Sequence, residues 1–219
     1  MMVVAAQGLR RNDFFDRARQ VLTLDEPIGL SNPDAVPTRG DHDLDPVSKE
    51  IAAVRPIKPA AVLIPVIERD EPMVLLTQRT AHLPQHAGQI AFPGGKIDPT
   101  DATPLAAALR EADEEIGLPA SVIDPIGYLD VYMTTLGYRI VPVVARVQPG
   151  FSLTLNPGEV DDAFEVPLSF MMEAANHQKH SREWQGLMRT YYAIPFGERY
   201  IWGVTAGIFR NLYERIYGA

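Results

Sequence analysis

Residues 110–118 read Arg-Glu-Ala-Asp-Glu-Glu-Ile-Gly-Leu, and residues 92–95, upstream of them, read Phe-Pro-Gly-Gly. The first stretch is rich in acidic side chains and lies between a start signal and a stop signal for a helix. Thr103 suits the N-cap position, a proline follows it, and Gly117 can adopt the left-handed conformation that ends a helix. The sequence therefore predicts a helix over residues 104–116, behind a glycine turn.

Three carboxylates of this predicted helix share one face. Glu111, Glu114 and Glu115 stand at positions i, i+3 and i+4, which places their Cβ atoms about 5–6 Å apart. They repel one another, and the nearby cation is Arg110, which can pair with Glu114. A hard divalent cation, Mg²⁺ or Mn²⁺, would offset this charge, because such ions are held by carboxylate oxygens together with substrate phosphates and waters. The pattern predicts a metal site that handles a diphosphate; the alternative is a solvated acidic face.

Other sites fail on composition or spacing. The chain has no cysteine, and the predicted helix has no His-x-x-x-His pair, so a zinc site is disfavoured. The run Gly94-Gly95-Lys96 is not a P-loop, because the earlier glycine and the following Ser or Thr are missing. Asp98 and Asp101 are expected to form a turn or a cap, with outer metal coordination as the alternative.

Residues 95–118 resemble the Nudix box, whose usual form is Gly, five residues, Glu, seven residues, Arg-Glu, an apolar residue, any residue, Glu-Glu, any residue, Gly and an apolar residue. The second half matches, with Ala112 in the apolar slot. In the first half Asp101 stands where a Glu is expected, and the stretch from Gly95 to Arg110 is one residue longer than usual. Such a lengthened box resembles the coenzyme A pyrophosphatase branch of the family in particular.

A second segment, residues 75–95, is similar to the upstream signature of coenzyme A-directed Nudix hydrolases. It begins Leu-Leu-Thr-Gln-Arg-Thr, continues through Gly88 and ends at the Phe-Pro-Gly-Gly turn. Two positions depart from that signature. Thr80 fills a Ser or Ala slot, and Pro84 stands where the signature has an Arg, so a phosphate contact from that Arg cannot be carried over.

Candidate substrate contacts follow from this segment. Arg79, His82 and His86 could meet phosphate oxygens, and the alternative for each is a plain role in a surface loop or at a strand end. Glycines tolerate unusual backbone dihedrals and leave room for a close approach to metal or phosphate. The substrate-binding residues that we predict are Arg79, His86, Gly94, Gly95 and Lys96.

The resemblance also implies roles for the helix. Glu111 and Glu115 would be the principal metal ligands, Glu114 would share metal binding or polarise the attacking water, and Arg110 would fix the carboxylate geometry. The general base stays open between Glu114 and Glu111. Some Nudix enzymes recruit a carboxylate from a later loop, for which Glu159 is the candidate here; its alternative is a solvated loop residue.

The rest of the chain predicts an α/β (α+β) domain, which the resemblance narrows to the Nudix α/β/α sandwich with a mixed central sheet. We divide the chain into an N-terminal extension, 1–54, and a Nudix hydrolase domain, 55–219. The extension holds an amphipathic helix over 13–22, a candidate for a subunit interface, and an irregular arm over 25–45. The further elements that we predict are strands over 60–67, 74–77, 126–134, 138–147 and 189–194, and helices over 168–175 and 204–217.

Composition limits the class of protein. The chain has 219 residues, 46% of them hydrophobic, and a formal net charge of −8. It shows no run of about 18 apolar residues that would span a membrane, and the apolar start at 1–6 lacks the basic region of a signal peptide. We expect a cytoplasmic protein without a membrane or nucleic-acid partner, since nucleic acid favours a basic surface. A homodimer is compatible with the sequence.

The function implied by the resemblance is metal-dependent cleavage of the diphosphate of coenzyme A or acyl-CoA to 3′-phosphoadenosine 5′-phosphate and (acyl-)phosphopantetheine. One alternative is a Nudix hydrolase of another nucleoside diphosphate derivative, such as ADP-ribose or NADH. Another is a non-catalytic Nudix module that senses a ligand. A group of aromatic residues could stack on an adenine, and the alternative is that these residues pack in the core. The group consists of Tyr191, Tyr192, Phe196, Tyr200 and Trp202.

Overall fold

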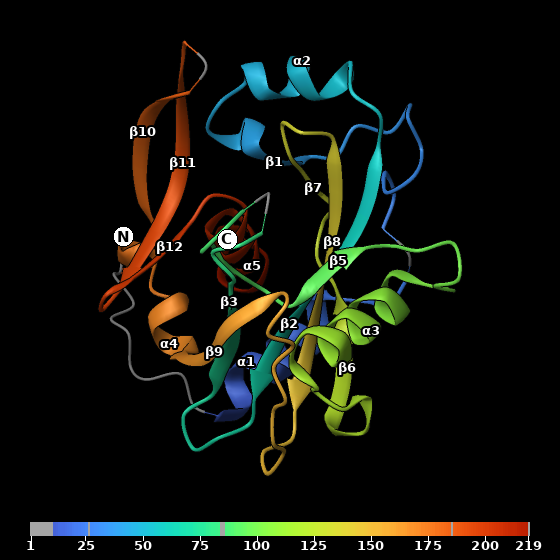
Figure 1. The fold of residues 1–219 in the computed structure, drawn as a ribbon, viewed down its shortest axis with the longest axis vertical. Coiled ribbons are helices and arrows are strands. Elements are labelled where there is room, and N and C mark those ends of the chain that lie inside the picture. The colour runs from blue at the N-terminus through green and yellow to red at the C-terminus, as the bar shows by residue number, and fades with distance from the viewer. Residues whose placement is uncertain (1–10, 26, 84–85, 185, 219) are drawn as a thin grey trace.

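A mixed sheet forms the centre of the computed structural model (Figure 1). The structure describes residues 11–25, 27–83, 86–184 and 186–218. Strand β2 (Lys58–Ile67) runs parallel to β8 (Tyr138–Val147) on one side and antiparallel to β3 (Met73–Arg79) on the other. The order along the sheet is β1-β7-β8-β2-β3-β4, with β5 joined to β2, β6 to β8 and β9 to β3. The remaining strands of this sheet are β1 (Arg39–Gly40), β4 (Ile90–Ala91), β5 (Gly94–Lys96), β6 (Ile123–Tyr128), β7 (Tyr132–Met133) and β9 (Val160–Pro167).

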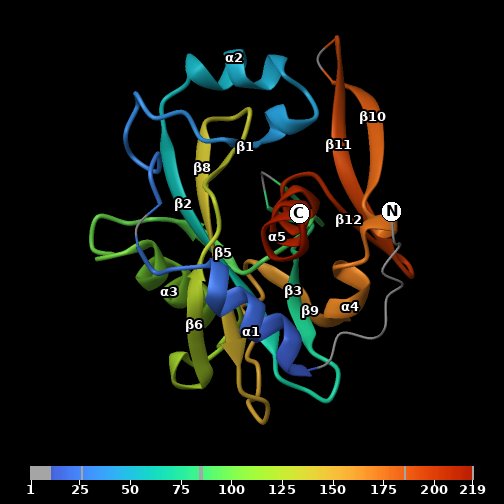
Figure 2. The same ribbon diagram turned by 180° about the vertical axis from the view of Figure 1, so that it is seen from behind.

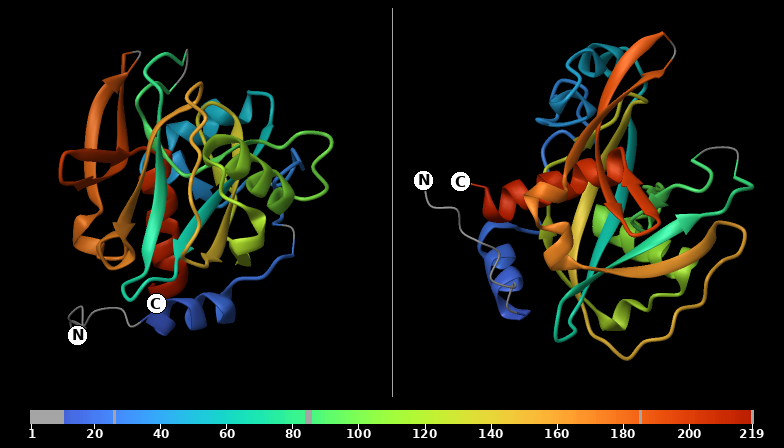
Figure 3. Two further views of the ribbon diagram at one scale, coloured as in Figure 1. Left: turned by 60° about the horizontal axis from the view of Figure 1, so that its bottom comes forward. Right: turned by 90° about the vertical axis from the view of Figure 1, so that its left-hand side faces the viewer.

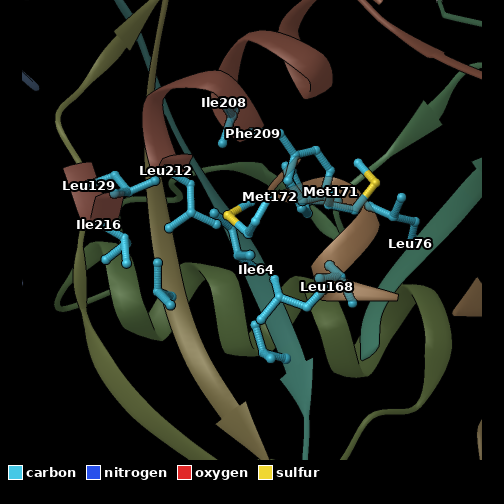
Figure 4. Close-up of a cluster of buried hydrophobic side chains, with 14 of the residues drawn as sticks. Ile64, Leu76, Leu129, Leu168, Met171, Met172, Ile208, Phe209, Leu212 and Ile216 are labelled. Atoms are coloured by element: carbon cyan, nitrogen blue, oxygen red, sulfur yellow. The ribbon is translucent and has the colours of Figure 1, made fainter. Parts of the chain in front are cut away.

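Helices cover both faces of the sheet, and this confirms the predicted α/β/α arrangement. Helix α3 (Pro104–Ile116) lies on one face, and α5 (Val204–Tyr217) and α1 (Arg11–Val21) lie on the other (Figures 1 and 2). Strand residues alternate between the two layers. Leu63 and Leu75 pack under α3, whereas Ile64 and Leu76 pack under α5, because successive strand side chains point to opposite faces. Figure 4 shows part of the α5 layer.

The signals at the ends of α3 act as predicted. The hydroxyl of Thr103 accepts a hydrogen bond from the amide of Ala106, and Gly117 has φ 64°, the left-handed C-cap conformation. The face of α3 that packs on the sheet consists of alanines and Ile116, whose side chain is fully buried. The helix is therefore fixed along its length, and the acidic face cannot rotate away from the sheet.

Several predicted elements differ from the observed ones. The strand expected over 126–134 is interrupted: β6 and β7 are separate, although both pair with β8. The helix expected over 168–175 is a single turn, α4 (Leu168–Met171), followed by the 3₁₀ turn η3 (Ala174–Asn176). The arm expected over 25–45 contains β1 and the 3₁₀ turn η1 (Asp41–Asp43), with a short helix, α2 (Val47–Ala53), after it. The helix over 204–217 and the strands around 60–67 and 74–77 are confirmed.

A second sheet extends from the body beside α5 (Figure 3). It consists of β10 (Gln178–Trp184), β11 (Leu187–Phe196) and β12 (Arg199–Trp202), all antiparallel. The strand predicted over 189–194 is its middle strand. Ile194 and Ile201 point inward and are fully buried with the side chains of α5. Within the described ranges, we find no helix with the length and apolar character needed to cross a bilayer.

Helix α1 is built into the core. Phe14 and Ala18 have no exposed surface, and Phe15 is 4% exposed. A Cβ atom on Gly127 would lie 2.6 Å from the Cβ of Leu22, so the chain after α1 packs directly on β6. The prediction that this apolar face serves a subunit interface is therefore wrong, because the face is already buried within its own chain.

The arm after α1 is held by a buried cation from β8. The Nη1 of Arg139 donates hydrogen bonds to the backbone oxygens of Gly29, Asn32 and Ala35, and the side chain is 6% exposed. The arm has little regular structure of its own, so this one side chain satisfies polar groups that a helix or strand would pair internally. The arm also faces the loop before α3 across a cavity of about 270 Å³.

We expect Arg139→Met to loosen the arm without unfolding the domain. Three carbonyl oxygens lose the hydrogen bond from Arg139, which should lower the free energy of unfolding by about 1–3 kcal/mol. Hydrogen exchange at the amide of Ala35, which is bonded to Asn32, should become faster. The exposed Arg55 offers a matched control, and Arg55→Met should change neither quantity. Equal behaviour of the two variants would show that Arg139 does not hold the arm.

Candidate active site

Glu115 is the buried member of the acidic face. Its side chain is 3% exposed, and its Oε2 accepts a hydrogen bond of 3.2 Å from the amide of Gly94. The Nη1 of Arg79, at the end of β3, lies 3.4 Å from its Oε1. Burial, with smaller contributions from the charges of Glu111 and Glu159, raises the pKa of Glu115 to about 7, against the hydrogen bond from Gly94 and the charge of Arg79. A carboxylate held in this way needs further positive charge to stay ionised.

Glu111 lies against the glycine turn. A Cβ atom on Gly95 would be 2.6 Å from its carboxylate, so only a glycine leaves room for this side chain. Partial burial raises the pKa of Glu111, the ion pair with Arg110 lowers it, and the charges of Glu114 and Glu159 raise it again. The backbone of β5 therefore lies against two carboxylates, that of Glu115 at Gly94 and that of Glu111 at Gly95.

Arg110 binds four acidic or carbonyl partners at once. Its Nη1 donates to Glu111 and to Glu114, each at 3.0 Å, and its Nη2 donates to the backbone oxygen of Lys96 at 3.2 Å. Its other edge makes a bidentate pair with Asp101, at 3.1 and 2.9 Å. This pair holds the pKa of Asp101 below its usual range. Arg110 thus fixes the directions of both glutamates, and Asp101 fixes Arg110.

Glu159 reaches the same place from the turn before β9. The amide of Asn156 donates to the backbone oxygen of Glu115, and the backbone oxygen of Glu159 accepts from the amide of Thr80. These bonds hold the turn over the end of α3. The side chain of Glu159 is half-buried, and its Oε1 accepts a 3.4 Å hydrogen bond from the side-chain Nδ2 of Asn156. Its charge contributes to raising the pKa of both Glu111 and Glu115, so Glu159 lies near the acidic pair.

Some predicted substrate contacts lie apart from this cluster. His86 is exposed, has φ 58° and bonds Gln89 within its own loop. His82 is exposed as well, and the side chain of Lys96 points to solvent. Pro84 lies outside the described residues. Arg79 is in the cluster, where its Nη1 lies 3.4 Å from Oε1 of Glu115. The roles of these side chains toward a substrate stay predictions.

The donor set suits a hard divalent cation. The four carboxylates of Glu111, Glu114, Glu115 and Glu159 supply only oxygen ligands, the kind that Mg²⁺ and Mn²⁺ prefer. In the described part of the chain, no three acidic or histidine side chains are already gathered around one point in metal-binding geometry. Instead Arg110 holds Glu111 and Glu114, and Arg79 holds Glu115. The oxygen ligands thus fit a divalent cation. To bind it, the glutamates would leave their contacts with Arg110 and Arg79 and turn toward the ion.

The aromatic residues separate into two groups. Tyr191, Tyr200 and Trp202 lie on the outer face of the second sheet, where the rings of Tyr191 and Trp202 are 5.3 Å apart. Tyr192 and Phe196 pack against the hydrophobic core. Core packing is therefore the role of the second group, and adenine stacking stays a prediction for the first.

We expect Gly95→Ala to reduce hydrolysis while leaving the fold intact. The three atoms nearest to the new methyl group all belong to the carboxylate of Glu111, the end of a flexible side chain that can swing away, so the free energy of unfolding should change little. Displacing a catalytic group by about 1 Å can lower turnover about a hundredfold. Gly94→Ala is the contrasting control, because its Cβ would lie 2.4 Å from the backbone oxygen of Ala61 and should destabilise the sheet. Unchanged turnover in Gly95→Ala would remove Glu111 from the site.

Comparison with known proteins places these residues in a family. The model of the NUDIX domain matches residues 57–185. An "Uncharacterized Nudix hydrolase NudL" of Escherichia coli (strain K12) is 41% identical over 157 residues, which are 72% of this chain and 82% of that protein. Among solved structures, the Ap4A hydrolase of C. elegans in a binary complex is similar with TM-score 0.42 and 21% identity, over 50% of this chain and 80% of that one. The MutT protein of Methanosarcina mazei Go1 has TM-score 0.44 and 22% identity, over 54% and 83%.

Proposed function

The chain belongs to the NUDIX domain family and is a hydrolase of a nucleoside diphosphate derivative, and we propose that its substrate is coenzyme A or an acyl-CoA. The products would be 3′-phosphoadenosine 5′-phosphate and phosphopantetheine, or its acyl derivative. What supports this choice is the segment 75–95, with its similarity to the coenzyme A-directed signature. The segment supplies Arg79 and the Gly94-Gly95 turn, both of which contact the acidic residues of α3.

The extra residue between Gly95 and Arg110 supports the same branch. It lies in the loop before α3, where Asp101 accepts from the amide of Asp98 and from Arg110. The longer loop therefore still allows Asp101 to hold Arg110.

The carboxylates would divide the work of the reaction. Glu111 and Glu115 are the proposed metal ligands, Glu114 assists them, and Arg110 keeps their directions. A Mg²⁺ or Mn²⁺ ion bound there would neutralise the diphosphate oxygens and lower the pKa of a coordinated water. We assign the general base to Glu159, since Arg110 holds both Glu111 and Glu114, whereas among the described residues the carboxylate of Glu159 is held by the side-chain amide of Asn156 rather than by a cation. It would take a proton from water while the water oxygen bonds to phosphorus and the bridging P–O bond breaks.

Pro84 favours a second candidate. Because the expected Arg is replaced there, the enzyme could act on ADP-ribose or NADH instead. A product-resolved screen separates the two: coenzyme A, acetyl-CoA, ADP-ribose and NADH are each incubated with Mg²⁺ or Mn²⁺, and the products are identified by mass. We expect 3′-phosphoadenosine 5′-phosphate as the product of the fastest reaction. Faster release of AMP from ADP-ribose or NADH would overturn the substrate assignment while leaving the hydrolase in place.

A further inference from the structure

Strand β10 leaves one edge of the second sheet open. It pairs with β11 alone, from Gln178 opposite Ala193 to Trp184 opposite Leu187. Among the described residues, the backbone groups of β10 bond to no element other than β11. The strand is the outer strand of its hairpin in both Figure 1 and Figure 2. A free edge of this kind presents unpaired backbone donors and acceptors to another strand.

The side chains of β10 carry opposite charges at equal distances from its centre. Lys179 lies two residues before Ser181, and Glu183 lies two residues after it. All three side chains are exposed and share one face, because alternate residues of a strand point the same way. Charged residues on an edge strand commonly block pairing. Here, by contrast, the two charges are arranged so that the strand is complementary to itself.

We propose that a second copy of this chain adds its own β10 antiparallel to this edge, about a two-fold axis at Ser181. In that register Lys179 lies opposite the partner's Glu183, and Glu183 lies opposite the partner's Lys179. Opposite charges directly across an antiparallel pair are favourable, and the symmetry supplies the pair twice. The two three-stranded sheets join into one continuous sheet across the dimer.

The charge pattern selects this register over its neighbours. A two-fold axis perpendicular to the sheet keeps each side chain on its face, so the strands can shift only in steps that pair residues of the same face. An axis at Arg182 would set two like charges against each other. An axis at His180 would leave Lys179 opposite a serine. Only the axis at Ser181 pairs each lysine with a glutamate.

The other face of β10 tolerates the same arrangement. There His180 comes opposite the partner's Arg182. The guanidinium of Arg182 lies 4.5 Å from the centre of the Trp202 ring in its own sheet and 5.9 Å from that of Tyr191. Its charge is thus satisfied by aromatic faces of its own chain. Since α3 and Glu115 lie on the main sheet, each copy keeps its own acidic site away from this interface.

Charge reversal tests the proposal. Lys179→Glu and Glu183→Lys each set like charges opposite each other at two symmetric points, whereas the double variant restores both pairs with exchanged signs. Sedimentation velocity over a concentration series should show a dimer for the wild-type protein. Each single reversal should raise its dissociation constant about tenfold or more, and the double variant should return it toward the wild-type value. Lys49→Glu, which makes the same charge change on the exposed side of α2, is the control and should not weaken the dimer.

Three results would overturn the interface. The wild-type protein could stay monomeric at every concentration, the single reversals could match Lys49→Glu, or the double variant could fail to recover. Circular dichroism of each variant shows that it is folded, so a lost dimer cannot be mistaken for an unfolded chain. A general effect of net charge is separated from pairing by Lys49→Glu, because this variant changes the net charge as much as Lys179→Glu does but lies on α2, away from the edge.

Discussion

Glu115→Gln should abolish most hydrolysis and leave the protein at least as stable as the wild type. Removing even an outer partner of a metal ligand costs about 10–100-fold in activity, so losing the ligand should lower turnover by at least about a hundredfold. Stability should not fall, because Glu115 is buried and its raised pKa shows that its charge is held at a cost. The side-chain carbonyl oxygen of the Gln can still accept the hydrogen bond from the backbone N–H of Gly94. The steady-state rate and the free energy of unfolding are measured on the same preparation.

Asp113→Asn is the matched control for this change. Asp113 lies on the same helix, two residues away, but its side chain is exposed and none of the site contacts described above involves it. The same neutralisation there should leave the rate near that of the wild type. If Glu115→Gln also turned over at a near-normal rate, Glu115 would not be a metal ligand, and the acidic face would serve only solubility.

Phe14→Ala should destabilise the whole domain by about 3–5 kcal/mol, the usual cost of removing a buried aromatic ring. Phe14 has no exposed surface and lies in the same hydrophobic cluster as Ile64 and Phe209, on the side of the sheet that α1 and α5 cover. The ring of Phe15 is 5.6 Å away, so the vacated space cannot close without moving it. Denaturant unfolding, followed by a probe in the main sheet, measures the change.

Val21→Ala provides the control on the same helix, since Val21 is 36% exposed and should cost much less. The comparison also bears on the division of the chain at residue 54. If residues 1–54 formed a separate extension, Phe14→Ala would leave the unfolding of the sheet unchanged. A shared loss of stability would place α1 within the hydrolase domain.

Local signals allowed α3 to be predicted from the sequence. Its cap, its proline and its terminal glycine are all within a few residues of the helix, and the structure confirms both ends. The spacing of Glu111, Glu114 and Glu115 is equally local. The pairing of Arg79 with Glu115 joins residues 36 positions apart, and no pattern within either segment indicates it. The phosphate contact of Arg79 stays a prediction, and the structure adds its contact with Glu115.

Elements that depend on distant partners could not be predicted. Strand β10 reads Gln-Lys-His-Ser-Arg-Glu-Trp and has no alternating apolar pattern, so only its pairing with β11 makes it a strand. The arm is ordered by Arg139, more than a hundred residues away. The pair between Asp101 and Arg110 was missed as well, although Asp101 occupies the slot where the family has a Glu. The position of Asp101 in the box was therefore the one feature of the sequence that could have indicated this pair.

Binding of Mn²⁺ tests the central claim, that the carboxylates beside the Gly94-Gly95 turn hold a divalent cation. Electron paramagnetic resonance measures free Mn²⁺ directly during a titration, without any substrate or turnover. We predict that the wild-type protein and Asp113→Asn bind the ion alike, and that Glu115→Gln and Glu111→Gln bind it far more weakly. Equal binding by all four proteins, or none by the wild type, would contradict the account.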